Sequence, residues 1–156
     1  MESVMSVSEM YNVAEIELVY KTKIKASQRP KVTSSKEVYN VLLQSWDKNK
    51  IEFVEQFKIL LLNRCGRILG IVEVSTGGIA GTVADPKVIF SAALKANASS
   101  LILAHNHPSG NIKPSEADKY LTRKIKEVGK LLDISVLDHI IVTTEGYCSL
   151  ADEGEM

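Results

Sequence analysis

In the stretch Leu101-Ile102-Leu103-Ala104-His105-Asn106-His107-Pro108-Ser109-Gly110, a short apolar run leads directly into two histidines. A continuous apolar run of this length is typical of a strand that is buried on both faces. Side chains two residues apart on an extended segment point to the same side. We therefore expect His105 and His107 to project together from the end of a buried strand.

A carboxylate follows at the start of the next expected helix. In Pro114-Ser115-Glu116-Ala117-Asp118 the serine is a typical N-cap, and Ser115 and Asp118 share a helix face because they are three residues apart. Two imidazoles and a carboxylate form the ligand set of a catalytic zinc that keeps one position for water. We therefore predict that His105, His107 and Asp118 bind one Zn²⁺. Two plainer interpretations stay open: Ser-x-x-Asp can be only a capping device, and a His-x-His pair can be only a turn or a polar strand edge.

A zinc hydrolase also needs a base that takes the proton of the attacking water. Alternation along residues 53–61 places Glu55 on an otherwise apolar face, where a carboxylate is costly without a partner. Glu55 is therefore the candidate base, although at a strand end it could also reach solvent, and alternation does not exclude Glu52 or Glu73. Ser115 is either the helix cap or a hydrogen-bond donor to an oxyanion beside the metal.

The rest of the chain predicts an α/β (α+β) fold with one mixed sheet between helices. Expected strands cover residues 15–21, 53–62, 68–74, 100–104, 134–142 and 147–150, and expected helices cover 34–48, 85–96 and 115–132. In the helix after Ser115 we expect an inward stripe of Ala117, Leu121, Ile125, Val128 and Leu132. His139 lies inside an expected strand and is interpreted as a core residue or a partner of a ligand, not as a ligand.

Composition narrows the class of protein. The 156 residues suffice for one domain with a core, and the 19 basic and 19 acidic residues cancel, which argues against binding held mainly by phosphate neutralisation. Cys65 and Cys148 form no C-x-x-C pair and are expected as free thiols that pack or lie at the surface. No signal peptide is evident, and no apolar run approaches the roughly 20 residues of a membrane span. We therefore expect a cytoplasmic protein.

The spacing His-x-His, seven residues, Ser, two residues, Asp resembles the JAMM (MPN-plus) metalloprotease signature. The string His-Asn-His-Pro-Ser-Gly resembles the bacterial RadC branch specifically, and Asn106 stands where eukaryotic deubiquitinating members usually carry Ser or Thr. Residues 55–57, 60–63 and 137–141 also look RadC-like. The resemblance covers roughly residues 35–152 and leaves 1–34 as an N-terminal extension with a strand.

This resemblance implies a JAB/MPN fold, related to cytidine deaminases, with a curved sheet flanked by helices. It implies zinc bound by His105, His107 and Asp118, Glu55 as general base and Ser115 as oxyanion support. The implied activity is hydrolysis of a peptide or isopeptide bond in an unidentified peptide or protein. Two departures are visible: residues 1–34 leave no room for the helix-hairpin-helix module of longer RadC proteins, and Lys87 stands where an arginine is expected.

Two other functions stay open at this point. The RadC branch carries an old association with DNA repair, so the chain could be an accessory factor in repair or recombination, although its charge does not support DNA binding. It could also be a catalytically silent JAB scaffold, against which the complete ligand set argues. The oligomeric state is open, and a dimer is among the alternatives.

Overall fold

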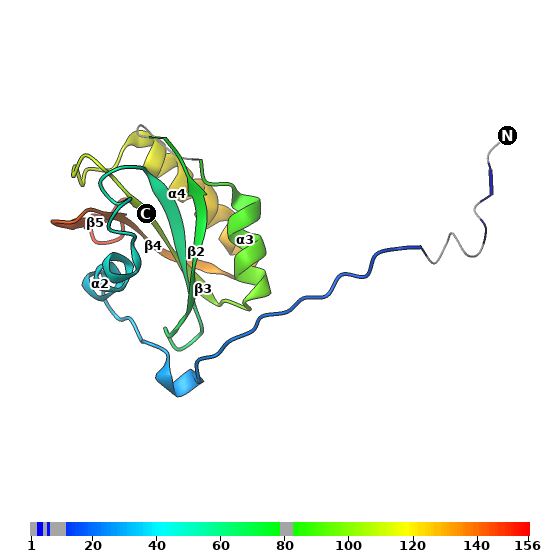
Figure 1. Ribbon diagram of the computed structural model, residues 1–156. Helices are drawn as coiled ribbons and strands as arrows, with labels where there is room; N and C mark the ends of the chain where they lie inside the picture. Colours follow the sequence, from blue (N-terminus) through cyan, green and yellow to red (C-terminus); the bar gives the residue numbers. More distant parts are fainter. Residues whose placement is uncertain (1–2, 5, 7–11, 79–82) are drawn as a thin grey trace.

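The computed structural model describes residues 3, 4, 6, 12–78 and 83–156, which form one mixed sheet between helices (Figure 1). The sheet has five strands in the order β2-β1-β3-β4-β5, in which β3 and β4 are parallel and the other neighbours are antiparallel. The strands are β1 (Gln56–Leu62), β2 (Ile68–Thr76), β3 (Ser100–Asn106), β4 (Ser135–Val142) and β5 (Tyr147–Ser149).

The helices cover the two faces of this sheet and create two cores. Helix α2 (Ser35–Ser45) packs on one face, and α3 (Pro86–Lys95) and α4 (Glu116–Leu131) pack on the other; a short 3-10 turn η1 (Ala26–Gln28) precedes them. Strands β1 and β3 are buried along their whole length, because alternate residues enter opposite cores. None of the helices within the described ranges is long and apolar enough to cross a membrane.

The predicted helix starts are confirmed by their caps. The Ser34 side chain accepts a hydrogen bond from the backbone of Glu37, and Asp85 accepts one from Lys87. Ser115 begins α4 with a full capping box. Such caps satisfy backbone N–H groups that have no partner inside the helix, so these short local patterns were sufficient to fix where each helix begins.

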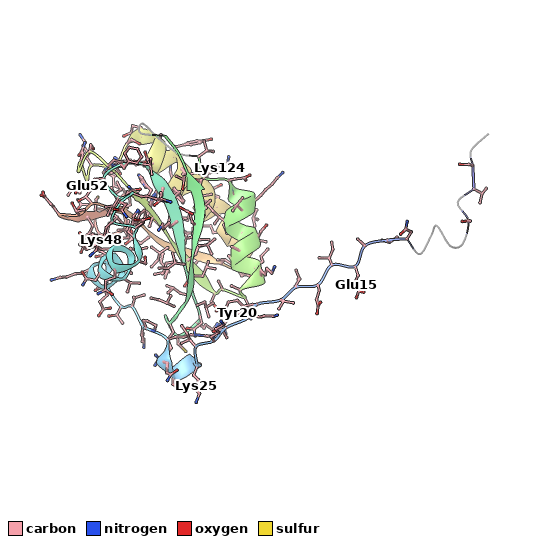
Figure 2. All side chains as sticks on the ribbon, viewed as in Figure 1. Glu15, Tyr20, Lys25, Lys48, Glu52 and Lys124 are labelled. Carbon is pink, nitrogen blue, oxygen red and sulfur yellow. The ribbon has the colours of Figure 1, made fainter. Side chains whose placement is uncertain are left out.

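Two strand expectations need correction. The strand expected from residue 53 begins only at Gln56, because residues 50–53 form a turn that leaves Phe53 64% exposed. The strand expected over 15–21 is not formed: its backbone is extended but pairs with no strand among the described residues, and it runs away from the domain. Figure 2 shows Glu15 far from the domain and Tyr20 close to it.

The inward face of α4 is also different from the predicted stripe. Ile125 is buried as expected and Leu121 and Val128 pack partly, but Ala117 and Leu132 are exposed. Thr122 and Gly129 are buried in their place. The stripe was predicted from apolar side chains alone. It therefore missed Thr122, which is buried with its hydroxyl hydrogen-bonded, and Gly129, which is buried in close contact with the backbone of Ile134.

That close contact makes Gly129→Ala a destabilising change. A Cβ at Gly129 would come closer to the carbonyl oxygen of Ile134 than carbon and oxygen normally approach. We expect the free energy of unfolding to fall by about 1–3 kcal/mol, despite the better helix propensity of alanine. Urea denaturation measures this change. Gly146→Ala is the control, because a Cβ there meets no atom within 4 Å; equal stability of the two variants would contradict the prediction.

Candidate metal centre

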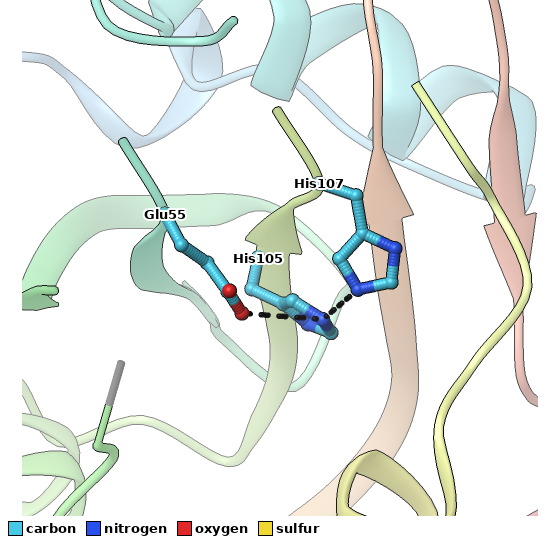
Figure 3. Close-up of side chains that lie close together, drawn as sticks. All are labelled: Glu55, His105 and His107. Carbon is cyan, nitrogen blue, oxygen red and sulfur yellow. Dashed lines mark hydrogen bonds and ion pairs between the residues drawn. The ribbon is translucent and has the colours of Figure 1, made fainter. Parts of the chain in front are cut away.

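The two histidines meet at the end of β3, as the alternation predicted. His105 lies in the last part of the strand and is 1% exposed, and His107 follows directly after the strand and is half-buried. Their Nε2 atoms are 2.9 Å apart (Figure 3). Both imidazoles therefore present one nitrogen to the same point.

Two carboxylates converge on this point from different elements. Asp118, in the first turn of α4, has Oδ1 3.4 Å from His105 Nε2 and Oδ2 3.7 Å from His107 Nε2. Glu55, which directly precedes β1, has Oε1 3.9 Å from His105 Nε2. The ligand atoms of Glu55, His105 and His107 all lie within 4.8 Å of one another, so this group could hold a metal ion (Figure 3).

A buried hydrogen-bond chain fixes which nitrogen of His105 carries a proton. Thr122 Oγ1 donates to the carbonyl oxygen of Asp118 at 2.7 Å, so its single proton is used and it must accept from His139 Nδ1 at 2.6 Å. Burial lowers the pKa of His139 well below its usual range, so its ring is neutral and its Nε2 is bare. His105 Nδ1 must then donate to this nitrogen at 2.7 Å. In a neutral His105, the lone pair of Nε2 therefore faces the site.

His107 is held in the same tautomer by the backbone. Its Nδ1 lies 2.5 Å from the carbonyl oxygen of Asn111, which can only accept, so Nδ1 carries the proton. Two neutral rings in these tautomers would face each other with bare nitrogens 2.9 Å apart, and a proton or a metal ion between the nitrogens removes this repulsion. The donor set of imidazoles and carboxylates therefore fits a divalent metal ion by its own chemistry.

The charges around the site also favour the binding of a cation. Burial works against ionisation of Asp118, but its interactions with His105 and His107 outweigh burial and hold the pKa of its carboxyl well below the usual range. The Asp118 carboxylate in turn raises the pKa of His107, which burial opposes. Asp118 is therefore ionised across the physiological pH range and available to bind a cation.

Asn106 is a residue of this site that the sequence interpretation missed. It is fully buried on the other side of β3, where Nδ2 donates to the carbonyl oxygens of Ile51 at 2.7 Å and Val54 at 2.8 Å. Its Oδ1 accepts from the backbone N–H of Gln56 at 2.7 Å. Glu55 lies between two of these partners, so Asn106 clamps the backbone that carries the Glu55 carboxylate.

The structure also locates the other predicted candidates. Glu52 accepts a hydrogen bond from Thr144, and Glu73 bonds to Gln56 and Thr76, so both of these rival bases are engaged elsewhere. Ser115 acts as the cap of α4, and its backbone N–H donates to Asp118 Oδ2 at 2.8 Å, which helps to orient that carboxylate. Because the capping hydroxyl accepts, its own proton is not used in the cap, and oxyanion support by Ser115 stays a prediction.

Thr122 and His139 should affect metal binding without touching the ion. Thr122→Val removes the acceptor that fixes the His139 tautomer, and His139→Phe removes the partner of His105 Nδ1. We expect each change to weaken divalent metal binding about 10–100-fold, measured by competition with a chromophoric chelator. Thr143→Val is the control, because Thr143 is also buried but its hydroxyl bonds only to the backbone of Gly146; a loss of affinity there would argue for a general effect on folding.

Comparison with known proteins identifies relatives of this chain. The family model for the RadC-like JAB domain matches residues 32–155. A UPF0758 protein of Flavobacterium johnsoniae is 42% identical over 124 residues, which cover 80% of this chain and 53% of the relative. UPF0758 protein SH1266 of Staphylococcus haemolyticus is 38% identical over 128 residues, covering 82% and 55%, and UPF0758 protein TTE0897 of Caldanaerobacter subterraneus is 33% identical over 162 residues, covering 96% and 68%.

The chain spans about half the length of the Flavobacterium and Staphylococcus relatives. The matched region contains α2 to α4, the whole sheet and every residue of the candidate site. The mixed sheet flanked by helices is the architecture expected for a JAB/MPN fold. The chain therefore belongs to the RadC-like JAB domain family.

Proposed function

We propose that this protein is a zinc-dependent metallopeptidase that hydrolyses a peptide or isopeptide bond. The observation that carries the proposal is the pair of imidazole Nε2 atoms 2.9 Å apart, each on a ring whose Nδ1 is hydrogen-bonded to the protein, with two carboxylates beside them. In a histidine pair with a purely structural role, we would expect the Nε2 atoms as well as the Nδ1 atoms to form hydrogen bonds to other groups of the protein. Here each Nδ1 does so and each Nε2 faces the carboxylates.

His105, His107 and Asp118 are the residues that would hold the ion. Ligand atoms about 2.0–2.1 Å from a tetrahedral zinc are about 3.3 Å from one another, and the 3.4 and 3.7 Å separations of Asp118 from the two imidazoles are close to this value. Glu55 is further from His105, at 3.9 Å, which favours a role beside the ligands. When bound, zinc supplies a Lewis acid that polarises a carbonyl group and acidifies water.

Glu55 would take the proton of the attacking water and return it to the leaving amine. Its carboxylate is partly exposed, so it can reach a substrate, and the Asn106 clamp holds its backbone in place. The Ser115 hydroxyl would donate to the oxyanion that forms on the carbonyl. A polar hollow of about 210 Å³ adjoins His107 between residues 108–110 and 143–145 and could receive part of a peptide chain.

Metal analysis of the purified protein, followed by a panel of peptides and isopeptides, tests the proposal. We expect close to one zinc per chain in the wild type and in Cys65→Ser, and loss of zinc in His107→Ala. Cys65 is the control because it is an exposed thiol that could take up zinc adventitiously. Both cysteines are free, which fits the cytoplasm, where we place the protein.

Zinc-loaded protein that cleaves nothing across a broad panel would contradict the peptidase and favour a silent scaffold. Salt-dependent retention of DNA without any hydrolysis would favour a role in DNA repair instead.

A further inference from the structure

Basic residues gather in one part of this chain, although its net charge is zero. Residues 18–36 contain six basic residues and no acidic residue, and the turn between β1 and β2 adds Arg64 and Arg67. The next acidic residue along the chain is Glu37, whose carboxylate accepts hydrogen bonds from the backbone N–H and the hydroxyl of Thr33. The equal totals of acidic and basic residues therefore conceal a strongly basic stretch.

Hydrogen bonds bring this basic stretch and the β1–β2 turn together. The Tyr20 hydroxyl donates to the carbonyl oxygen of Leu69 at 2.7 Å. Arg67 Nη1 donates to the carbonyl oxygen of Arg29 at 2.8 Å. Residues 21–28 are therefore held at both ends against the start of β2. Seven cationic side chains meet here, all exposed except the half-buried Arg29 and Arg67, and we name them the basic surface: Lys21, Lys23, Lys25, Arg29, Lys31, Arg64 and Arg67.

The basic surface lies at the end of the sheet away from the metal centre. Leu62, the last residue before the β1–β2 turn, pairs with Ser100, whereas Phe57 pairs with His105. Five residues of strand separate these pairs by about 17 Å. Figure 2 shows Lys25 at this end of the domain. Because salt screens charges beyond about 8 Å at physiological ionic strength, the carboxylates of the metal centre do not neutralise the basic surface.

We propose that the basic surface binds the phosphate backbone of duplex DNA without reading its base sequence. Lys and Arg, together with Ser, Thr and Gln, are the side chains that contact phosphates in protein–DNA complexes. Thr22, Ser27 and Gln28 are exposed between the cations. The backbone that carries these groups is already fixed to β2, which reduces the ordering cost of binding. The binding does not depend on the proposed peptidase activity, because the metal centre lies at the other end of the sheet.

Two other polyanions fit the basic surface less well. Proteins that hold single strands without sequence preference stack the bases on aromatic rings, but the one aromatic residue in 18–36 is Tyr20, which lines the groove beside β2. Helices that bind a membrane surface insert an apolar face beside their basic residues. Residues 21–31 contain only a three-residue turn and one large apolar side chain, Ile24. These observations favour duplex DNA.

Fluorescence anisotropy with a labelled duplex of mixed sequence tests the binding. We expect a dissociation constant of about 1–100 µM at physiological salt. The logarithm of the association constant should fall against the logarithm of the salt concentration with a slope of about −4 to −5, because each of the five exposed cations that meets a phosphate contributes about −0.9. The triple variant Lys23→Gln, Lys25→Gln, Arg64→Gln should bind more weakly and should reduce the size of this slope by about 3.

The matched control removes the same charge from exposed positions outside the basic surface. It carries Lys48→Gln, Lys50→Gln and Lys124→Gln, and we expect it to keep the wild-type slope (Figure 2). Equal slopes for the two triple variants, or no binding by the wild type at low salt, would overturn the proposal. Tighter binding to a single strand of the same length, or binding to phosphatidylserine vesicles without binding to the duplex, would also overturn it.

Discussion

Glu55→Gln is expected to lower turnover by about 10²–10⁴-fold while the bound metal stays in place. Glutamine keeps the size of the side chain and the Asn106 clamp on the backbone, but an amide cannot take the proton of the attacking water. The measurement is kcat/KM on whichever substrate the peptide panel yields, together with the metal content of the same preparation. Glu52→Gln is the matched control, because Glu52 lies in the neighbouring turn and bonds to Thr144.

Measured together, kcat/KM and metal content distinguish the roles of the Glu55 and Asp118 carboxylates. If Glu55→Gln loses its metal and Asp118→Asn keeps it, Glu55 is a ligand and the assignment of base and ligand is reversed. The mutual spacing of Glu55, His105 and His107 makes that outcome a real alternative. If both variants keep metal and activity, the proposed mechanism is wrong.

Asn106→Leu is expected to lower the free energy of unfolding by about 3–5 kcal/mol. Leucine has a similar volume but leaves a buried carbonyl group, a part-buried carbonyl group and a buried N–H without their partner, and each unmatched buried group costs about 1–3 kcal/mol. Urea denaturation followed by circular dichroism measures the change. Asn111→Leu is the control, since Asn111 is exposed and its side chain bonds only to the backbone of Lys113.

A loss of less than about 1 kcal/mol in Asn106→Leu would show that the clamp is replaceable, because one unmatched buried group alone costs that much. In that case the position of Glu55 would have to be set by the strand that follows it. The expected large loss would instead mean that the turn before β1 is held from β3, across 50 residues of sequence.

The sequence predicted the parts of the site that local periodicity controls. Alternation along β3 placed the two histidines on one side, and the three-residue spacing from the cap placed Asp118 at the start of α4. Glu55 was assigned on alternation from residue 53, where the chain in fact forms a turn; the residue lies beside the histidines, but its expected local structure was wrong. The burial of His139 in β4 was predicted and is confirmed.

Asn106 and Thr122 carry no comparable local signal. The amide of Asn106 bonds to residues 50 to 55 positions earlier, and Thr122 reaches His139 across 17 positions. Hydrogen bonds between distant segments depend on how the strands and helices are brought together. A polar residue inside an apolar strand or on a buried helix face therefore indicates that a partner exists but does not say which one.

The chain from His105 through His139 and Thr122 ends on the backbone of Asp118, whose own carboxylate points back at His105. These groups form a closed ring, so none of them can rotate without breaking a bond to its neighbour. A metal site held by such a ring of hydrogen bonds keeps its geometry when the metal ion is removed. Chelator-treated protein should therefore give an NMR spectrum that matches that of the metal-loaded protein everywhere except beside the ring, and it should bind metal again without a slow refolding phase.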